Sequence, residues 1–120
     1  MKKQFRLRRT EDFVRVRQEG RSYRHPFFII NLAPNGLPHN RYGFITAKRL
    51  GKAVVRNRVR RRLRESVRHL HPSLPPGHDI VIIARLSVVG QPWETLHQTL
   101  AATFSRAGLK IDYQNRDKRK

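Results

Sequence analysis

The sequence contains no cysteine, so disulfide bonds and thiolate zinc sites are excluded. Only eight acidic residues stand against 27 lysines and arginines, which leaves few carboxylates for a metal cage or an acid–base pair. No apolar run approaches the ~18 residues of a membrane-spanning helix, and no apolar segment follows the basic start as in a signal peptide. These absences favour a cytoplasmic protein without a membrane span.

Arginine is the residue in excess. It supplies 20 of the 27 basic side chains, and the net charge is +19. A guanidinium group offers a planar set of donors that matches phosphate and can also stack on bases. At 120 residues the chain is long enough for one domain with a modest core. The composition therefore predicts a single nucleic-acid-binding domain.

The most one-sided stretch is Lys48–Arg68, which holds ten basic residues and one carboxylate, Glu65. Apolar residues recur within and just after it at helical spacing: Val55, Val59, Leu63, Val67 and Leu70. This pattern predicts a helix with one buried stripe, ended by Pro72, and an opposite face of guanidinium groups. Asn57 is the one neutral amide among these arginines. It could recognise a base edge or a ribose, or it could be an ordinary solvated helix residue.

The remaining chain predicts an α+β fold. Thr10 is expected to cap a short helix that ends near Glu19, because two acidic residues follow it. Two apolar runs joined by a turn-rich loop favour an antiparallel hairpin, and a third, β-branched run after the basic helix favours a parallel crossover. The two flanking segments are expected to be flexible. The hairpin is expected to be formed by Pro26–Ala33 and Tyr42–Ala47, the third strand by Asp79–Arg85 and a last helix by Trp93–Ala107. The flexible ends are 1–9 and 110–120.

Nothing in the sequence predicts a catalytic or metal site in the protein itself. The acids are scattered, and two of them, Glu11 and Asp12, already suit a helix start. His69, His71 and His78 are close in sequence but lack cysteine or a nearby acid cluster. Binding of a polyanion is the function that remains.

One block identifies a family resemblance. The residues from Gly43 to Arg58 read GFITAKRLGKAVVRNR, and with Arg6–Phe13 and the strand from Asp79 they resemble the protein subunit of bacterial ribonuclease P over most of the chain. The resemblance implies a fold like domain 2 of ribosomal protein S5. It also implies about four strands and a left-handed β-α-β crossover around the basic helix.

The same resemblance implies the function. The family's enzyme removes the 5′ leader from precursor tRNA, and its RNA subunit performs the chemistry with Mg²⁺. One protein is expected per RNA subunit. The implied contacts to that RNA come from Lys48, Arg49, Lys52, Arg56, Asn57, Arg58, Arg60, Arg61, Arg62 and Arg64. The implied contacts to the leader come from Phe13, Arg17, Ile29 and Asn31. Arg17 and Asn31 stand where the family often has aromatics, so the leader contacts are expected to rely more on charge and hydrogen bonds.

Three other functions fit the charge. A ribosomal or other structural RNA-binding protein shares the charge and fold type and is separated only by the block from Gly43 to Arg58. A nucleoid-type DNA binder would bind duplex DNA and structured RNA with similar affinity. A protein-only nuclease would cleave precursor tRNA without any RNA subunit.

Overall fold

The computed structural model of the chain describes residues 1–109. The basic tail predicted to be flexible, 110–120, lies outside the described residues. Within the described part, three α-helices and four β-strands alternate with short 3-10 helices (η). In chain order they are η1 (Lys3–Phe5), α1 (Thr10–Glu19), β1 (Arg21–Arg24), β2 (Phe28–Pro34), β3 (Arg41–Ile45), η2 (Lys48–Leu50), α2 (Ala53–Leu70), η3 (His71–Ser73), β4 (His78–Ala84), η4 (Leu86–Val88) and α3 (Trp93–Arg106).

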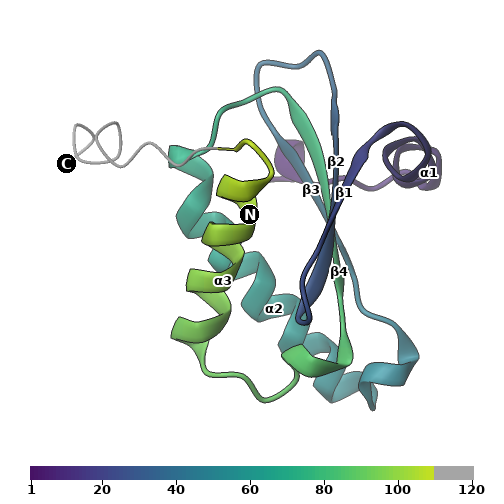
Figure 1. The fold of residues 1–120 in the computed structure, drawn as a ribbon. Helices are drawn as coiled ribbons and strands as arrows, with labels where there is room; N and C mark the ends of the chain where they lie inside the picture. Colours follow the sequence, from purple (N-terminus) through teal and green to yellow (C-terminus); the bar gives the residue numbers. More distant parts are fainter. Residues whose placement is uncertain (110–120) are drawn as a thin grey trace.

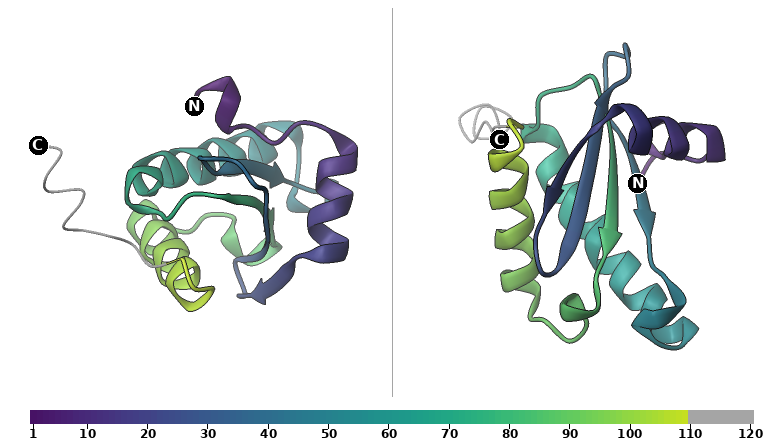
Figure 2. Two further views of the ribbon diagram at one scale, coloured as in Figure 1. Left: turned by 90° about the horizontal axis from the view of Figure 1, so that it is seen from above. Right: turned by 45° about the vertical axis from the view of Figure 1, so that its right-hand side comes forward.

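The four strands form one mixed sheet that separates α1 from the other two helices (Figure 1). Seen from above, α2 and α3 cover one face and α1 covers the other (Figure 2). The larger core lies between the sheet, α2 and α3, and the smaller core lies under α1. The predicted α+β class is confirmed.

The strand order is β1-β2-β4-β3, so the predicted hairpin of β2 with β3 is wrong. β4 lies between them, antiparallel to β2 and parallel to β3. The β-branched segment of β4 is buried on both faces, which is why it takes the central position. The turn-rich loop between β2 and β3 therefore spans two strand positions, whereas the predicted parallel crossover through α2 is present.

The true hairpin is formed by β1, which the sequence analysis did not predict, and β2. Only Tyr23 of β1 is partly buried, and its other three residues are exposed. A polar edge strand of this kind gives no alternating apolar signal, and its charged side chains protect the open edge. The segment after Gly20 consequently reads as a loop.

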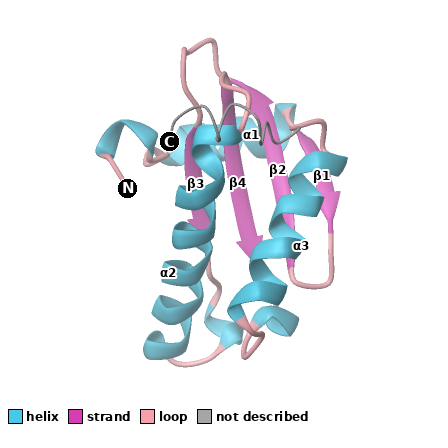
Figure 3. Cartoon of the chain, turned by 90° about the vertical axis from the view of Figure 1, so that its left-hand side faces the viewer, coloured by secondary structure: helices cyan, strands magenta, loops and turns pink. Residues whose placement is uncertain are grey.

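The helix α2 matches its prediction closely. Its apolar stripe packs into the larger core, where Val59, Leu63, Val67 and Leu70 are buried. The helix ends at Leu70, two residues before Pro72. Figure 3 shows α2 lying in front of β3 and β4, with α3 beside it in front of β2 and β1. The sheet thus holds α2 by one side only.

The start of α1 differs by one residue from its prediction. Thr10 is the first helical residue, and Arg9 occupies the cap position without a side-chain cap bond. The helix ends at Glu19 as expected, but Gly20 has an extended conformation, with φ −84°. A Cβ at Gly20 would lie 2.4 Å from the Val16 carbonyl oxygen and 2.6 Å from that of Leu32. Glycine is needed there because the helix end approaches β2 closely.

Candidate nucleic-acid interface

The predicted RNA-contacting residues lie on one continuous segment, from η2 through the N-terminal three turns of α2. They divide into two groups by exposure. Exposed members are Lys48, Arg49, Lys52, Asn57, Arg58 and Arg61, and partly buried members are Arg56, Arg60, Arg62 and Arg64. The exposed group forms a basic surface that runs from η2 and Lys52 onto the exposed side of α2.

Arg60 is held in place at the edge of this surface. Its Nη1 donates to Oδ1 of Asn57 at 2.9 Å, and its Nη2 donates to Oγ1 of Thr46 at 2.5 Å. Thr46 follows β3, so the pair of bonds ties the helix surface to the sheet. Asn57 is therefore more than a solvated residue, since its oxygen orients Arg60. Its amide nitrogen has no hydrogen-bond partner among the described residues and can donate to a ligand.

Two of the predicted arginines point inward. Nη1 of Arg62 donates to the backbone oxygen of Gln91 at 2.7 Å, which links α2 to the segment before α3. The Nε of Arg56 is buried and has no hydrogen-bond partner in the described part of the chain. Arg56 thus lies toward the packed side of α2, although the family resemblance implies that it contacts RNA.

A cavity of about 310 Å³ connects the basic surface of α2 with α1. Arg6, Arg60 and Arg64 line it together with the rings of Phe13 and Phe44. The guanidinium carbon of Arg64 lies 5.9 Å from the centre of the Phe44 ring. Burial lowers the pKa of Arg64, and the nearby charges of Arg6 and Arg60 lower it further. A concentration of like charges beside aromatic rings is typical of sites that take a phosphate and a base.

The face of the sheet that carries α1 is only partly covered. Val16 of α1 is fully buried in the smaller core, whose strand residues are Ala33 and Val81. Farther along the strands, Ile29 is in register with Ile83, which in turn is in register with Ile45. These three isoleucines form an apolar row that α1 leaves partly open, and Ile45 is 39% exposed. Hereafter this part of the sheet is called the open face.

The predicted leader-contacting residues lie around the open face. Phe13 is partly buried, and a Cβ at Gly43 would lie 2.5 Å from its ring, so the ring rests directly on β3. Arg17 is exposed one turn farther along α1. Asn31 is only 7% exposed, and its Oδ1 accepts a hydrogen bond from Ser22 at 2.8 Å. Asn31 thus lies mainly within the sheet beneath the open face and exposes little of its side chain.

A buried charge network, which the sequence analysis did not predict, attaches α1 to the sheet. The side chain of Asp79 is fully buried at the start of β4 and is paired with Arg15 of α1. It also accepts two hydrogen bonds from Arg41, at 2.7 and 2.8 Å, and one from Asn35 at 3.0 Å. The only signal in the sequence is an acid directly before an apolar strand, because its partners are far away along the chain.

The electrostatics of Asp79 follow from these contacts. Burial alone would raise the pKa of its carboxyl group, but the hydrogen bonds from Arg41 and Asn35 and the charges of Arg41 and Arg15 outweigh burial. The net pKa is lower than usual, so the carboxylate stays charged.

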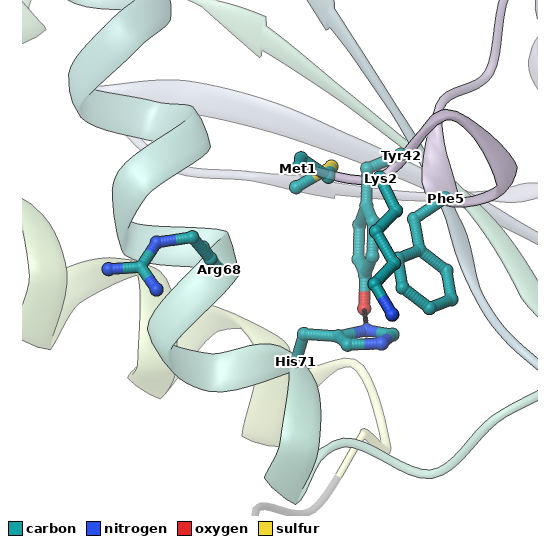
Figure 4. Close-up of a pocket in the computed structure, with 6 residues that line it drawn as sticks. All are labelled: Met1, Lys2, Phe5, Tyr42, Arg68 and His71. Atoms are coloured by element: carbon teal, nitrogen blue, oxygen red, sulfur yellow. Dashed lines mark hydrogen bonds between the residues drawn. The ribbon is translucent and has the colours of Figure 1, made fainter.

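A second hollow, of about 430 Å³, lies beside the end of α2 (Figure 4). Its lining is mostly apolar and includes Met1, Phe5 and Tyr42. The Tyr42 hydroxyl lies 2.7 Å from Nδ1 of His71, and burial raises the pKa of Tyr42. The segment before α1 is held against the domain here, because the backbone N–H of Leu7 donates to the backbone carbonyl oxygen of Tyr42 at 2.8 Å.

Residues 1–109 contain no group of three or more histidine, aspartate or glutamate side chains placed to hold a metal ion. Within the same residues, no helix combines the length and the apolar character needed to cross a membrane.

Comparisons with known proteins agree with one another. The family described as Ribonuclease P matches residues 1–108. A ribonuclease P protein component from Roseiflexus castenholzii is 46% identical over 110 residues, covering 91% of this chain and 90% of that protein. The solved structure of the RNase P protein from Thermotoga maritima superposes with a TM-score of 0.79 at 30% identity, covering 84% of this chain and 96% of that chain. The RNase P protein from Staphylococcus aureus superposes with the same score at 27% identity, covering 88% and 96%.

Proposed function

The chain belongs to the family of bacterial ribonuclease P protein components, subunits of an endoribonuclease, and on that premise we propose that it binds both the catalytic RNA and the 5′ leader of precursor tRNA. The observation that carries the proposal is the two-sided character of α2. One side is packed into the core, and the other presents exposed basic residues with Arg60 held in place by Asn57 and Thr46. The exposed side of α2 can therefore bind an RNA backbone while the packed side keeps the helix folded.

The contacts with the RNA subunit are assigned by exposure. Asn57, Arg58 and Arg61 are exposed on α2, and Lys48, Arg49 and Lys52 precede it. Arg60 and Arg64 reach the surface from its edge. Arg62 acts mainly through its bond to Gln91, and the buried Nε of Arg56 restricts it to contacts through its outer nitrogens. We further propose one protein per RNA subunit, with the whole chain acting as one RNA-binding domain.

The leader is proposed to lie on the open face. Phe13 offers an aromatic edge beside the isoleucine row that begins at Ile29, and Arg17 offers a charge above it. Asn31 lies in the sheet beneath the leader, and its Oδ1 accepts a hydrogen bond from Ser22. One aromatic ring and several cations support a grip on the backbone and on one base, whatever the sequence of the leader.

In this proposal the hydrolysis is performed by the RNA subunit with Mg²⁺, and the protein binds and positions. The chain's own residues would neutralise phosphates where the two RNAs approach each other, which lowers the metal concentration needed for activity. The cytoplasmic location stays a prediction.

The finer fold assignment also belongs to the proposal. In Figure 3 the arrows of β3 and β4 both point downward, α2 lies in front of them, and β4 lies to the right of β3. This arrangement supports the left-handed crossover and the likeness to domain 2 of ribosomal protein S5. Most crossovers have the opposite hand, so only the family resemblance could suggest it.

The first test adds the purified protein to a bacterial ribonuclease P RNA at low Mg²⁺ and measures leader removal. We expect clear stimulation. Arg58→Ala and Asn57→Ala should weaken binding to the RNA subunit, the former by about five- to eightfold at 0.1 M salt, since one phosphate contact changes the log–log slope by roughly 0.7 to 0.9. Arg21→Ala removes an exposed charge outside the basic surface and serves as the control. Absence of stimulation by the wild-type protein would refute the proposed function.

The second test concerns the leader. Phe13→Ala and Arg17→Ala should each weaken binding of precursor tRNA to the holoenzyme, while the affinity for mature tRNA stays unchanged. Phe13→Leu keeps an apolar group on Gly43 and separates loss of stacking from loss of packing. If precursor binding were unchanged in the two alanine variants, the open face would not be the leader site.

A further inference from the structure

The hollow beside the end of α2 differs in character from the basic surface, because most of its wall is apolar and aromatic. Its lining consists of Met1, Lys2, Phe5, Tyr42, Arg68 and His71 (Figure 4). At about 430 Å³ it lies within the range of sites that hold small organic molecules. The proposed function does not use it.

The hollow lies on the other side of the sheet from the open face. Tyr42 belongs to the larger core, between the sheet and α2, and Phe5 packs against the same core. The next residue of β3, Gly43, faces α1, since the ring of Phe13 rests on it. A ligand in the hollow would therefore be separated by the sheet from a leader on the open face.

The polar end of the hollow is fixed by hydrogen bonds. The Tyr42 hydroxyl lies 2.7 Å from Nδ1 of His71 and accepts a bond from Nδ2 of Asn40 at 3.4 Å. The same Nδ2 donates to the backbone oxygen of Pro75 at 2.9 Å, and Oδ1 of Asn40 accepts from the backbone N–H of His78 at 2.8 Å. These bonds join β3 to η3 and to the start of β4. The two rings are thus positioned before a ligand binds, which reduces the ordering cost of binding.

The segment η1 supplies a further aromatic wall. The centre of the Phe5 ring lies 4.4 Å from that of His71 and 5.5 Å from that of His39. Nε2 of His39 lies 3.2 Å from the backbone oxygen of Gln4, which helps to hold η1 in place. Phe5 is only partly buried, so part of its ring remains available to a ligand. Aromatic side chains of this kind form the stacking sites for unpaired bases in RNA-binding proteins.

The charges at the hollow are positive, and no carboxylate lines it among the described residues. The guanidinium group of Arg68 is directed away from the rings (Figure 4) and donates to Glu65 at 2.6 and 3.1 Å. Lys2 is exposed and forms no ion pair within residues 1–109. The ammonium group of Lys2 can therefore take a phosphate, while the stem of Arg68 adds to the apolar wall.

An aromatic wall with a cation beside it fits a planar group that is joined to an anion, and a nucleotide combines the two. Arg68 follows Arg61 of the basic surface by about two helical turns on the same face of α2. An RNA strand that lies along α2 would therefore reach the hollow where the helix ends.

We propose that the hollow binds one unpaired nucleotide of the RNA subunit, with the base beside Phe5 and Tyr42 and the phosphate on Lys2. The inference rests on the proposed function, because it assumes that the RNA subunit lies along α2.

The first measurement uses the full-length protein and adenosine 5′-monophosphate as the probe, at fixed ionic strength. The NMR signals of the Phe5, Tyr42 and His71 rings should shift with this nucleotide and hardly shift with ribose 5-phosphate, which lacks the base. Phe5→Leu keeps an apolar group in η1 and should weaken binding by about fivefold, the lower end of the contribution of one base–aromatic stack. Absence of the shifts, or equal shifts with ribose 5-phosphate, would overturn the proposal.

The second measurement titrates the RNA subunit with the same proteins. Lys2→Ala should weaken binding by about fivefold at 0.1 M salt, with a log–log salt slope lower by about 0.7, as expected for one single-strand phosphate contact. Phe5→Leu should weaken it without changing the slope. The matched control is Lys3→Ala, which removes the neighbouring exposed lysine outside the lining of the hollow.

The outcomes separate the two proposals. If the wild-type protein did not bind the RNA subunit, the proposed function itself would fail. If it bound, and Lys2→Ala and Phe5→Leu behaved like Lys3→Ala, the assignment to the RNA subunit would be overturned. Nucleotide binding that depended on Phe5 in that case would assign the hollow to a free mononucleotide instead.

Discussion

Asp79 is the residue on which the attachment of α1 most depends. Its carboxylate has no exposed surface, and its partners come from α1, β3 and the loop after β2. Asp79→Asn would leave Arg15 and Arg41 with only the more distant carboxylate of Asp12, at 3.8 and 3.7 Å, as a counter-charge. Because the two arginines are partly exposed and screened by solvent, we expect a loss of about 2 to 4 kcal/mol in the free energy of unfolding, measured by urea denaturation at pH 7.

The same substitution has a pH signature. The pKa of Asp79 in the folded protein lies below its ordinary value of 3.8. The stabilisation is therefore present above that ordinary pKa and is lost as the pH falls through the lower, folded pKa. The wild-type free energy of unfolding should decline in acid, and Asp79→Asn should flatten much of that decline. Glu65→Gln is the control, since the carboxylate of Glu65 is exposed beside Arg68. An equally steep decline in Asp79→Asn would show that other groups control acid stability.

At this scale, the sequence shows residue types but not their distant partners. Asn57 was singled out because it stands alone among arginines, and the structure gives it a partner, Arg60, only three residues away. The partners of Asp79 are Arg41 and Arg15, 38 and 64 residues away. Local spacing predicts contacts of the first kind, whereas contacts of the second kind depend on the order of the strands.

At the scale of the element, α2 separates stability from binding. Leu63 is fully buried between α2 and the sheet, whereas Arg61 is exposed on the helix surface. Leu63→Ala should lower the free energy of unfolding by about 2–5 kcal/mol, because it removes buried methyl groups and leaves a cavity. Arg61→Ala should change it by less than about 0.5 kcal/mol and should instead weaken RNA binding. Urea denaturation and RNA titration of the same two proteins check both effects, and equal destabilisation by both would contradict this division of the helix.

The elements were more predictable than their arrangement. The stripe of α2 and the apolar run of β4 depend on local periodicity, so both were predicted within about two residues. The pairing of β2 and β3 was wrong because it assumed that neighbours in sequence are neighbours in the sheet. β1 was missed because its four residues carry one inward side chain, Tyr23. The hairpin of β1 and β2 was therefore outside the reach of sequence reasoning.

The whole molecule carries a net charge of +19, and this charge opposes its own folding. In residues 1–109, only the carboxylates of Asp12, Glu65 and Asp79 form ion pairs. The many arginines without an acidic partner, including the exposed ones on the basic surface of α2, therefore repel one another in the absence of RNA. A ligand that neutralises them should stabilise the native state, since it binds the folded arrangement better than the unfolded chain.

The expected outcome is a stability that depends on anions. The midpoint of thermal unfolding should rise with sodium chloride, because salt screens the repulsion. At equal ionic strength it should rise further with sodium triphosphate, whose linked charges bind several arginines at once. A gain of about 1 kcal/mol corresponds to roughly 4–8 °C for a domain near this size. Differential scanning calorimetry in the two salts measures the difference. A triphosphate effect no larger than that of chloride would mean that the basic side chains act independently, and joint binding of one polyanion by neighbouring arginines would then be refuted.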